Sequence, residues 1–112
     1  MQIVDKISIS ELRTLASKMF GNLVKGVVDV ENEILVIDAD LHSDEEAFLI
    51  SNGSDQKNLW GINIYPDLSD EDRIEFDSLI NLRPSAGNNS RGVESEDIRN
   101  KIIKIVNSKL TN

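Results

Sequence analysis

The stretch from residue 24 to residue 37 constrains the fold more than any other part of this chain. Two runs rich in β-branched residues, 24–30 and 34–37, flank the polar tripeptide Glu31-Asn32-Glu33, and this pattern is typical of a β-hairpin. The second run, Ile34-Leu35-Val36-Ile37, contains no polar residue. An uninterrupted apolar strand of this kind is usually covered on both faces, so we expect it to be central in a sheet.

Amphipathic helices are predicted near both ends of the chain. The sequence Ser8-Ile9-Ser10-Glu11 resembles a capping box, in which the Ser8 hydroxyl and the Glu11 carboxylate bind backbone N–H groups. Apolar residues then recur at helical spacing up to Gly21, which is a natural helix stop. The last helix is expected to begin near Ser95, followed by Glu96, Asp97 and an apolar stripe at Ile98, Ile102, Ile105 and Val106.

The segment 43–53 is predicted to be a third helix. Ser43-Asp44-Glu45-Glu46 forms a second capping-box pattern, and Ser51-Asn52-Gly53 is expected to end the helix. A strand over residues 46–51 is the alternative, because the short apolar run 47–50 is too brief to show a period.

Two further strands, Leu59–Tyr65 and Arg73–Leu82, are predicted from alternating apolar and polar residues. If they form a hairpin, matching their apolar faces requires the numbers of paired residues to have an even sum. A sum near 140 pairs Ile64 with Phe76 and Trp60 with Ile80. Trp60 could stack on a ligand, but we expect it in the core, since one Trp and three Phe must serve the whole interior.

This register gives the hairpin a polar face. Asn63 is then opposite Asp77, and the same face carries Tyr65, Asn81 and Arg83. The polar face of an antiparallel sheet commonly just faces water, but here it leads directly into a loop with many hydrogen-bond donors.

Together the elements predict an α+β fold with the order α-β-β-α-β-β-α. We expect one domain over residues 1–112, with a small antiparallel sheet of about four strands packed by the N- and C-terminal helices.

Charge and composition exclude several classes of function. The chain has 20 acidic and 12 basic residues, a net charge of −8, so we expect no non-specific nucleic-acid binding. It has no cysteine, which rules out disulfides, thiolate zinc sites and cysteine nucleophiles. Neither a signal peptide nor a membrane span is visible in the sequence, so we expect a cytoplasmic protein that does not interact with membranes.

The Arg83–Arg91 loop is the strongest candidate for a binding site. Within it and on the polar face, the residues able to bind a small anionic ligand are Arg83, Ser85, Asn88, Asn89, Ser90, Arg91, Asn63, Tyr65, Asp77 and Asn81. Ordered loops often carry function. The structural alternative is that Arg83 or Arg91 pairs with an acid such as Asp77, while Asn88 and Ser90 hold the turn.

Several of these segments also resemble a known family. The runs Leu59-Trp60-Gly61-Ile62-Asn63, Glu75–Pro84 and Gly87–Val93, with Val28-Asp29 and Leu41–Glu45, are similar to a domain-of-unknown-function family of small uncharacterised bacterial proteins. The resemblance covers most of the chain. It implies no activity, cofactor or catalytic residue.

His42 is the only histidine, which excludes two-histidine zinc motifs, and we expect no metal site. A hydrolase would need His42 as its base, with Ser85 or Ser90 as nucleophile, and no nucleophile-elbow motif supports one. Together with Asp44 and Glu45, His42 is a secondary candidate site. The simpler interpretation is a capping or hydrogen-bonded histidine whose pKa is raised by these acids.

Three hypotheses follow from the sequence. The first is a binding module for a small anionic ligand at the Arg83–Arg91 loop. The second is a protein–protein interaction or regulatory protein, for which a homodimer is one form. The third is a hydrolase that uses His42. No cofactor can be named from the sequence.

Overall fold

A five-stranded antiparallel sheet forms the centre of the computed structural model, which describes all residues, 1–112. The strand order is β1-β4-β3-β5-β6. The strands are β1 (Gln2–Ile3), β3 (Val24–Asp29), β4 (Ile34–Ile37), β5 (Leu59–Ile64) and β6 (Ile74–Glu75). A separate parallel pair, β2 (Ile7–Ser8) and β7 (Leu110–Thr111), joins the two ends of the chain.

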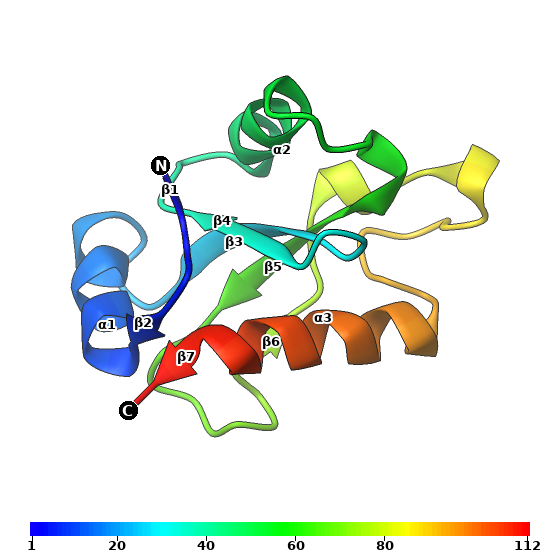
Figure 1. Ribbon diagram of the computed structural model, residues 1–112. Coiled ribbons are helices and arrows are strands. Elements are labelled where there is room, and N and C mark those ends of the chain that lie inside the picture. Colours follow the sequence, from blue (N-terminus) through cyan, green and yellow to red (C-terminus); the bar gives the residue numbers. More distant parts are fainter.

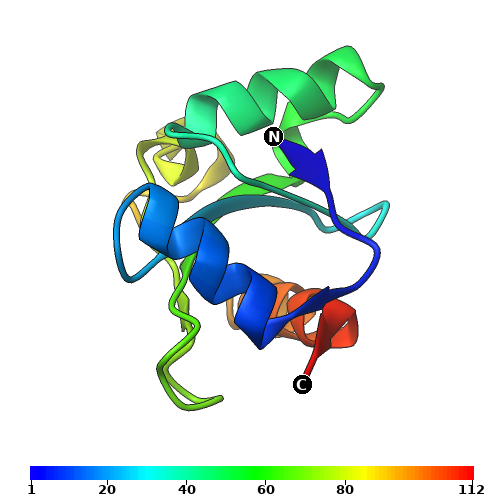
Figure 2. The same ribbon diagram turned by 90° about the vertical axis from the view of Figure 1, so that its left-hand side faces the viewer.

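Three helices cover the two faces of the sheet. They are α1 (Ile9–Lys18), α2 (His42–Ser51) and α3 (Glu96–Lys109). Helix α2 lies alone on one face, while α1 and α3 lie on the other (Figure 1). The turned view shows the same layers, with α2 apart from the other two helices (Figure 2). The predicted α+β class is therefore confirmed.

The β3–β4 hairpin and its predicted burial on both faces are also confirmed. Val27 pairs with Val36, and both are buried in the smaller apolar cluster with Leu49 of α2. Val28 and Leu35, which form the adjacent pair, belong to the larger cluster with α1 and α3. The alternation along each strand thus distributes the hydrophobic side chains between two cores.

The helix boundaries agree with the sequence except at the start of α2. The capping box of Ser8 and Glu11 is present, and Ser95 caps α3. The segment at 43–50 is helical, as predicted, but the expected cap at Ser43 is wrong. Helix α2 begins at His42, since the backbone N–H groups of Asp44 and Glu45 both reach the carbonyl of Leu41. No helix combines the length and apolarity needed to cross a membrane.

The second predicted hairpin is only partly formed. Ile64 pairs with Ile74 and Asn63 with Glu75, so the sum of paired numbers is even, as predicted, but two less than the value of 140 that gave the proposed pairs. The proposed pairs of Ile64 with Phe76, of Trp60 with Ile80 and of Asn63 with Asp77 are therefore wrong. Strand β6 ends at Glu75, and residues 79–81 form a short 3-10 helix.

Two other features were not visible in the sequence. Strand β5 pairs with β3 along its whole length, which makes β3 the middle strand. Strands β1, β2 and β7 have two residues each, too few for any pattern to be read.

Candidate functional site

The loop after β6 is held by side-chain amides. Asn81 is fully buried, and its side chain accepts a hydrogen bond from the Gly61 N–H (2.8 Å) and donates one to the Gly61 carbonyl (2.9 Å). Strand β6 pairs with β5 only at Asn63 and Ile64. At Gly61 the side-chain amide of Asn81 makes the two hydrogen bonds that a neighbouring strand would otherwise make. Asn81 also donates to the carbonyl of Arg91, which ties the far end of the loop to the sheet.

Asn88 closes the same loop from inside. Its side-chain nitrogen donates to the carbonyls of Asn81 (2.7 Å) and Gly92 (2.8 Å), and its side-chain oxygen accepts from the Glu94 N–H (2.9 Å). Gly87 precedes it with a φ of 83°, a left-handed conformation that glycine adopts without strain. Asn81 and Asn88 therefore build the loop and have no free groups for a ligand.

Arg83 points back into the protein. Its guanidinium donates to the carbonyls of Ile80 and Leu59, stacks 4.8 Å from the centre of the Trp60 ring, and lies 3.8 Å from Glu46. Burial lowers its pKa, while Glu46 opposes that effect. Arg83 therefore stabilises the base of the loop and covers Trp60. Its guanidinium is not available to clamp a ligand together with Arg91, as the sequence had suggested.

The remaining loop residues are exposed. Ser85 has no side-chain partner, and Ser90 accepts a hydrogen bond from the Gly92 N–H within the loop. Asn89 receives its one contact through its backbone N–H, which donates to Glu94. Nothing in the structure brings Ser85, Asn89 and Ser90 together around a common space.

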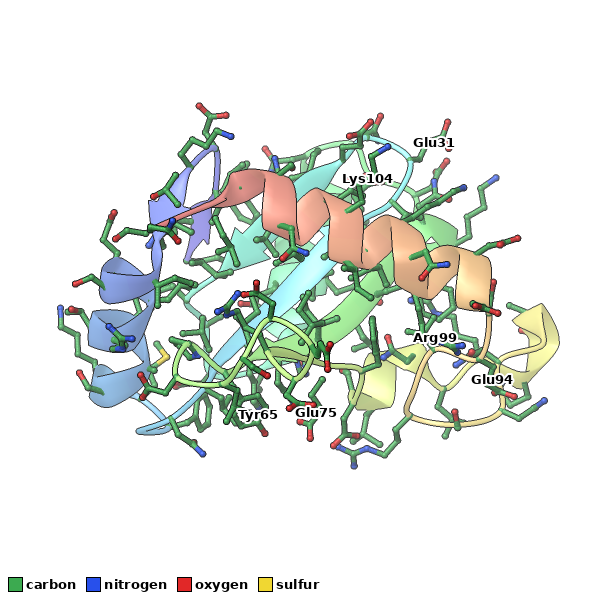
Figure 3. All side chains as sticks on the ribbon, turned by 90° about the horizontal axis from the view of Figure 1, so that it is seen from below. Glu31, Tyr65, Glu75, Glu94, Arg99 and Lys104 are labelled. Atoms are coloured by element: carbon green, nitrogen blue, oxygen red, sulfur yellow. The ribbon has the colours of Figure 1, made fainter.

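The polar face of the sheet centres on Glu75, not on Asp77. Asn63 donates to Glu75 (2.8 Å), and the Tyr65 hydroxyl does the same (3.0 Å). Figure 3 shows Tyr65 and Glu75 close together at the edge of the sheet. Burial and this bond to Glu75 raise the pKa of the Tyr65 hydroxyl, so it remains a neutral donor. Asp77 instead binds Arg91, with 2.7 Å between Nε and Oδ1.

A hollow of about 210 Å³ opens beside this Arg91–Asp77 pair. It collects side chains from four parts of the chain: Lys25 on β3, His42 and Ser43 on α2, Ser78 before the 3-10 helix, and Arg91 on the loop. Apolar walls come from Leu41, Leu79 and Ile80. We refer to this space as the hollow. His42 and the Arg83–Arg91 loop both border it, a proximity that the sequence could not show.

His42 anchors the floor of the hollow as a neutral ring. Its Nε2 lies 2.7 Å from the carbonyl of Ile62, and a carbonyl only accepts, so Nε2 carries the proton. The neutral ring then has its lone pair on Nδ1. Burial lowers the pKa of His42, and the nearby positive charge of Lys25 lowers it further. The predicted rise caused by Asp44 and Glu45 is therefore wrong.

The two neighbouring acids lie elsewhere. Asp44 is exposed on the outer side of α2, whereas Glu45 is fully buried with neither carboxylate oxygen hydrogen-bonded. Burial raises the pKa of Glu45 to about 9, so this group is a neutral acid at pH 7. No three histidine or acidic side chains converge as a metal site.

The positive groups of the hollow are Lys25 and Arg91. Lys25 is half-buried opposite Asn63 in the β3–β5 register, and no carboxylate lies within ion-pair distance of it. Arg91 uses only its Nε for Asp77, which leaves the outer edge of the guanidinium free. The sequence analysis missed Lys25 and Ser78. For Lys25 a signal existed, because it is a lone lysine within the apolar run 24–30.

The backbone of α2 adds further donors. The cap residue Leu41 has no side chain that could accept hydrogen bonds, and the N–H groups of His42 and Ser43 have no partner in the protein. Such unpaired groups, with the helix dipole behind them, favour a negative charge. No serine hydroxyl is hydrogen-bonded to His42, so the Ser–His pair of a hydrolase is not formed.

Comparison with known proteins gives a family without an activity. Residues 1–109 match the family described as "Protein of unknown function (DUF5674)". No curated protein and no solved structure shows a significant match to the chain.

Proposed function

Because the chain belongs to the DUF5674 family of proteins of unknown function, we propose its function from its own geometry: it binds a small anion in the hollow. Three groups that favour a negative charge meet at the hollow of about 210 Å³, and this observation carries the proposal. They are Lys25, which has no ion-pair partner, Arg91, which binds Asp77 through Nε alone, and the start of α2, which has no side-chain cap. The site of the proposed ligand therefore moves from the exposed loop to the space between that loop and α2.

The charge of the protein makes this convergence significant. With 20 acidic against 12 basic residues, a cation has many carboxylates that it could pair with. Lys25 nevertheless stands without one, over the ring of Phe20 at 4.8 Å. A positive group that remains unpaired in an acidic, half-buried setting is well placed to receive an anion.

The donors also suit the shape of a carboxylate or phosphate group. Arg91 presents the planar edge of a guanidinium, which binds such oxygens through two parallel hydrogen bonds. Ser43 and Ser78 add neutral hydroxyl donors. His42 contributes its backbone N–H, since its ring is neutral and occupied by Ile62.

The size and walls of the hollow restrict the ligand further. A volume of about 210 Å³ lies below the roughly 300–1,000 Å³ of typical ligand pockets. Leu41, Leu79 and Ile80 line the rest of the space. We therefore expect a small anion with a short apolar portion, not a nucleotide or a polyanion.

Isothermal titration calorimetry tests this proposal with inorganic phosphate, sulfate and acetate as probes, in buffer of low ionic strength. Lys25→Gln and Arg91→Gln should each weaken binding at least about fivefold, the usual effect of removing a charged hydrogen-bond donor. The matched control is Arg13→Gln, which removes the same charge from another exposed Arg–Asp pair, Arg13–Asp67.

Equal weakening in the Arg13→Gln control would show that the probes sense only net charge. Absence of heat and of any thermal shift with all three anions would refute the proposal for this class of ligand. Circular dichroism of each variant establishes that the fold is retained.

A further inference from the structure

A second, larger depression lies on the other side of α2. It has a volume of about 540 Å³ and is bounded by the N-terminus, the end of α1 and the outer surface of α2. We propose that this groove binds a short basic segment of another protein, which inserts an apolar side chain between its methionines. The inference does not depend on the anion site.

The floor of the groove is apolar and adaptable. Met1 and Met19 line it with exposed fractions of 51% and 42%, and Phe48 of α2 lies half-buried between the rim and the smaller core. Methionine side chains are flexible and polarisable, so they adjust to apolar partners of different shapes. Large side chains of this kind left exposed in one groove indicate an interaction surface.

The rim of the groove is acidic. Asp38, Asp40 and Asp44 surround the apolar floor. Asp38 lies 3.8 Å from the N-terminal ammonium group, whereas Asp40 and Asp44 have no cation within ion-pair distance. Unpaired like charges around an apolar floor favour a partner that carries lysine or arginine beside its apolar anchor.

The backbone keeps these acids in place. Asp38 has a φ of 73°, a left-handed conformation at the end of β4 that turns the chain towards α2. Asp is one of the few residues that tolerate this conformation. The acidic rim is thus formed by the turn after β4 and by the first turn of α2.

A second copy of the chain is a poorer occupant than a separate protein. The basic residues of the C-terminal region, among them Lys101 and Lys104, lie on α3. Helices α2 and α3 are on opposite faces of the sheet (Figure 1). A contact between the groove of one copy and α3 of the next would be head-to-tail, an arrangement that closes into rings or grows into open filaments.

Fluorescence anisotropy with a labelled synthetic peptide of alternating Lys and Leu residues tests the proposal. Asp40→Asn with Asp44→Asn should weaken binding about five- to tenfold, as expected for two partly exposed ion pairs. The matched control is Glu71→Gln with Asp72→Asn, which removes the same charge from an exposed loop away from the groove. It should change the affinity less than about twofold.

The apolar part of the proposal is tested with a second peptide in which Ser replaces each Leu at unchanged charge. It should bind distinctly more weakly than the first. Equal loss in both double variants, equal affinity for both peptides, or no binding of the first peptide would overturn the proposal. Self-association in sedimentation that the Asp40/Asp44 variant abolishes would also overturn it, in favour of a second copy.

Discussion

Replacing the buried Glu45 with glutamine should stabilise the protein, and the gain should increase with pH. Glu45 lies on the buried face of α2, where both of its carboxylate oxygens are unpartnered. Burial raises its pKa in the folded protein to about 9, against 4.5 as its ordinary value. Glutamine has nearly the same shape and no proton to lose, so Glu45→Gln removes this titration with little change in packing.

The magnitude follows from the two pKa values. Below pH 4.5 the carboxyl is protonated in both states, and its ionisation costs the folded state nothing. Between pH 4.5 and about 9 unfolding releases one proton, so stability falls by about 1.4 kcal/mol for each pH unit. At pH 7 the accumulated loss is about 3 kcal/mol, a large part of the stability of a domain this size.

Urea unfolding followed by circular dichroism at pH 5, 7 and 8 measures the effect. The free energy of unfolding of Glu45→Gln, relative to the wild type, should rise by roughly 2–3 kcal/mol from pH 5 to pH 7. Comparing the two pH values removes any constant cost of burying the amide. Glu71→Gln, at an exposed position, is the control and should show no such rise.

A difference between wild type and Glu45→Gln that stays constant across this pH range would refute the reasoning. It would mean that Glu45 titrates as an ordinary carboxyl, with its charge reaching water or a cation.

Three further predictions concern the loop and the hollow. Gly61→Ala should cost about 1–3 kcal/mol, because a Cβ there falls 2.5 Å from that of Ser78; Ser78→Gly in the same chain should recover part of the loss in a urea titration. Asn81→Ala should lower the free energy of unfolding by about 2–4 kcal/mol, since it leaves both backbone groups of Gly61 unpaired at a buried site. Its control, Asn89→Ala at an exposed position, should lower it by less than about 0.5 kcal/mol in the same assay. NMR titration of the single histidine should give a pKa below 6.5 for His42, and saturating phosphate should raise it; a value above 6.5 in the free protein would contradict the buried, neutral ring.

The elements with local signals could be predicted from the sequence. The capping residues Ser8 and Ser95 and the β3–β4 hairpin depend on residues within a few positions of one another. Their partners lie so close in the sequence that a local pattern reveals them. The cap of α2 was misplaced because Ser43 offered a good capping pattern, yet the carbonyl of Leu41 closes the first turn.

The second hairpin could not be predicted because a distant side chain replaces a strand. Residues 74–82 alternate like a strand, but the amide of Asn81 binds Gly61, twenty positions away in sequence. Ser78 packs so closely on Gly61 that any side chain there would clash. A periodic pattern cannot show such a contact, since it depends on which residues meet across the fold.

The structure places some of the residues predicted for the site beside the hollow and others away from it. Arg91 lines the hollow and Asp77 pairs with it, whereas Arg83 is directed into the protein. Lys25 reaches the same region only through the pairing of β3 with β5. Its position beside the hollow could not be read from the sequence, because the pairing of β3 with β5 was not predicted.

The measurement that tests the central claim most directly is a phosphate titration followed by two-dimensional ¹H–¹⁵N NMR. Binding in the hollow predicts the largest shifts at the backbone amides of His42 and Ser43, which have no partner in the free protein, and at the Arg91 side chain. Shifts confined to the exposed loop around Ser85 and Asn89, with His42 and Ser43 unmoved, would contradict the account.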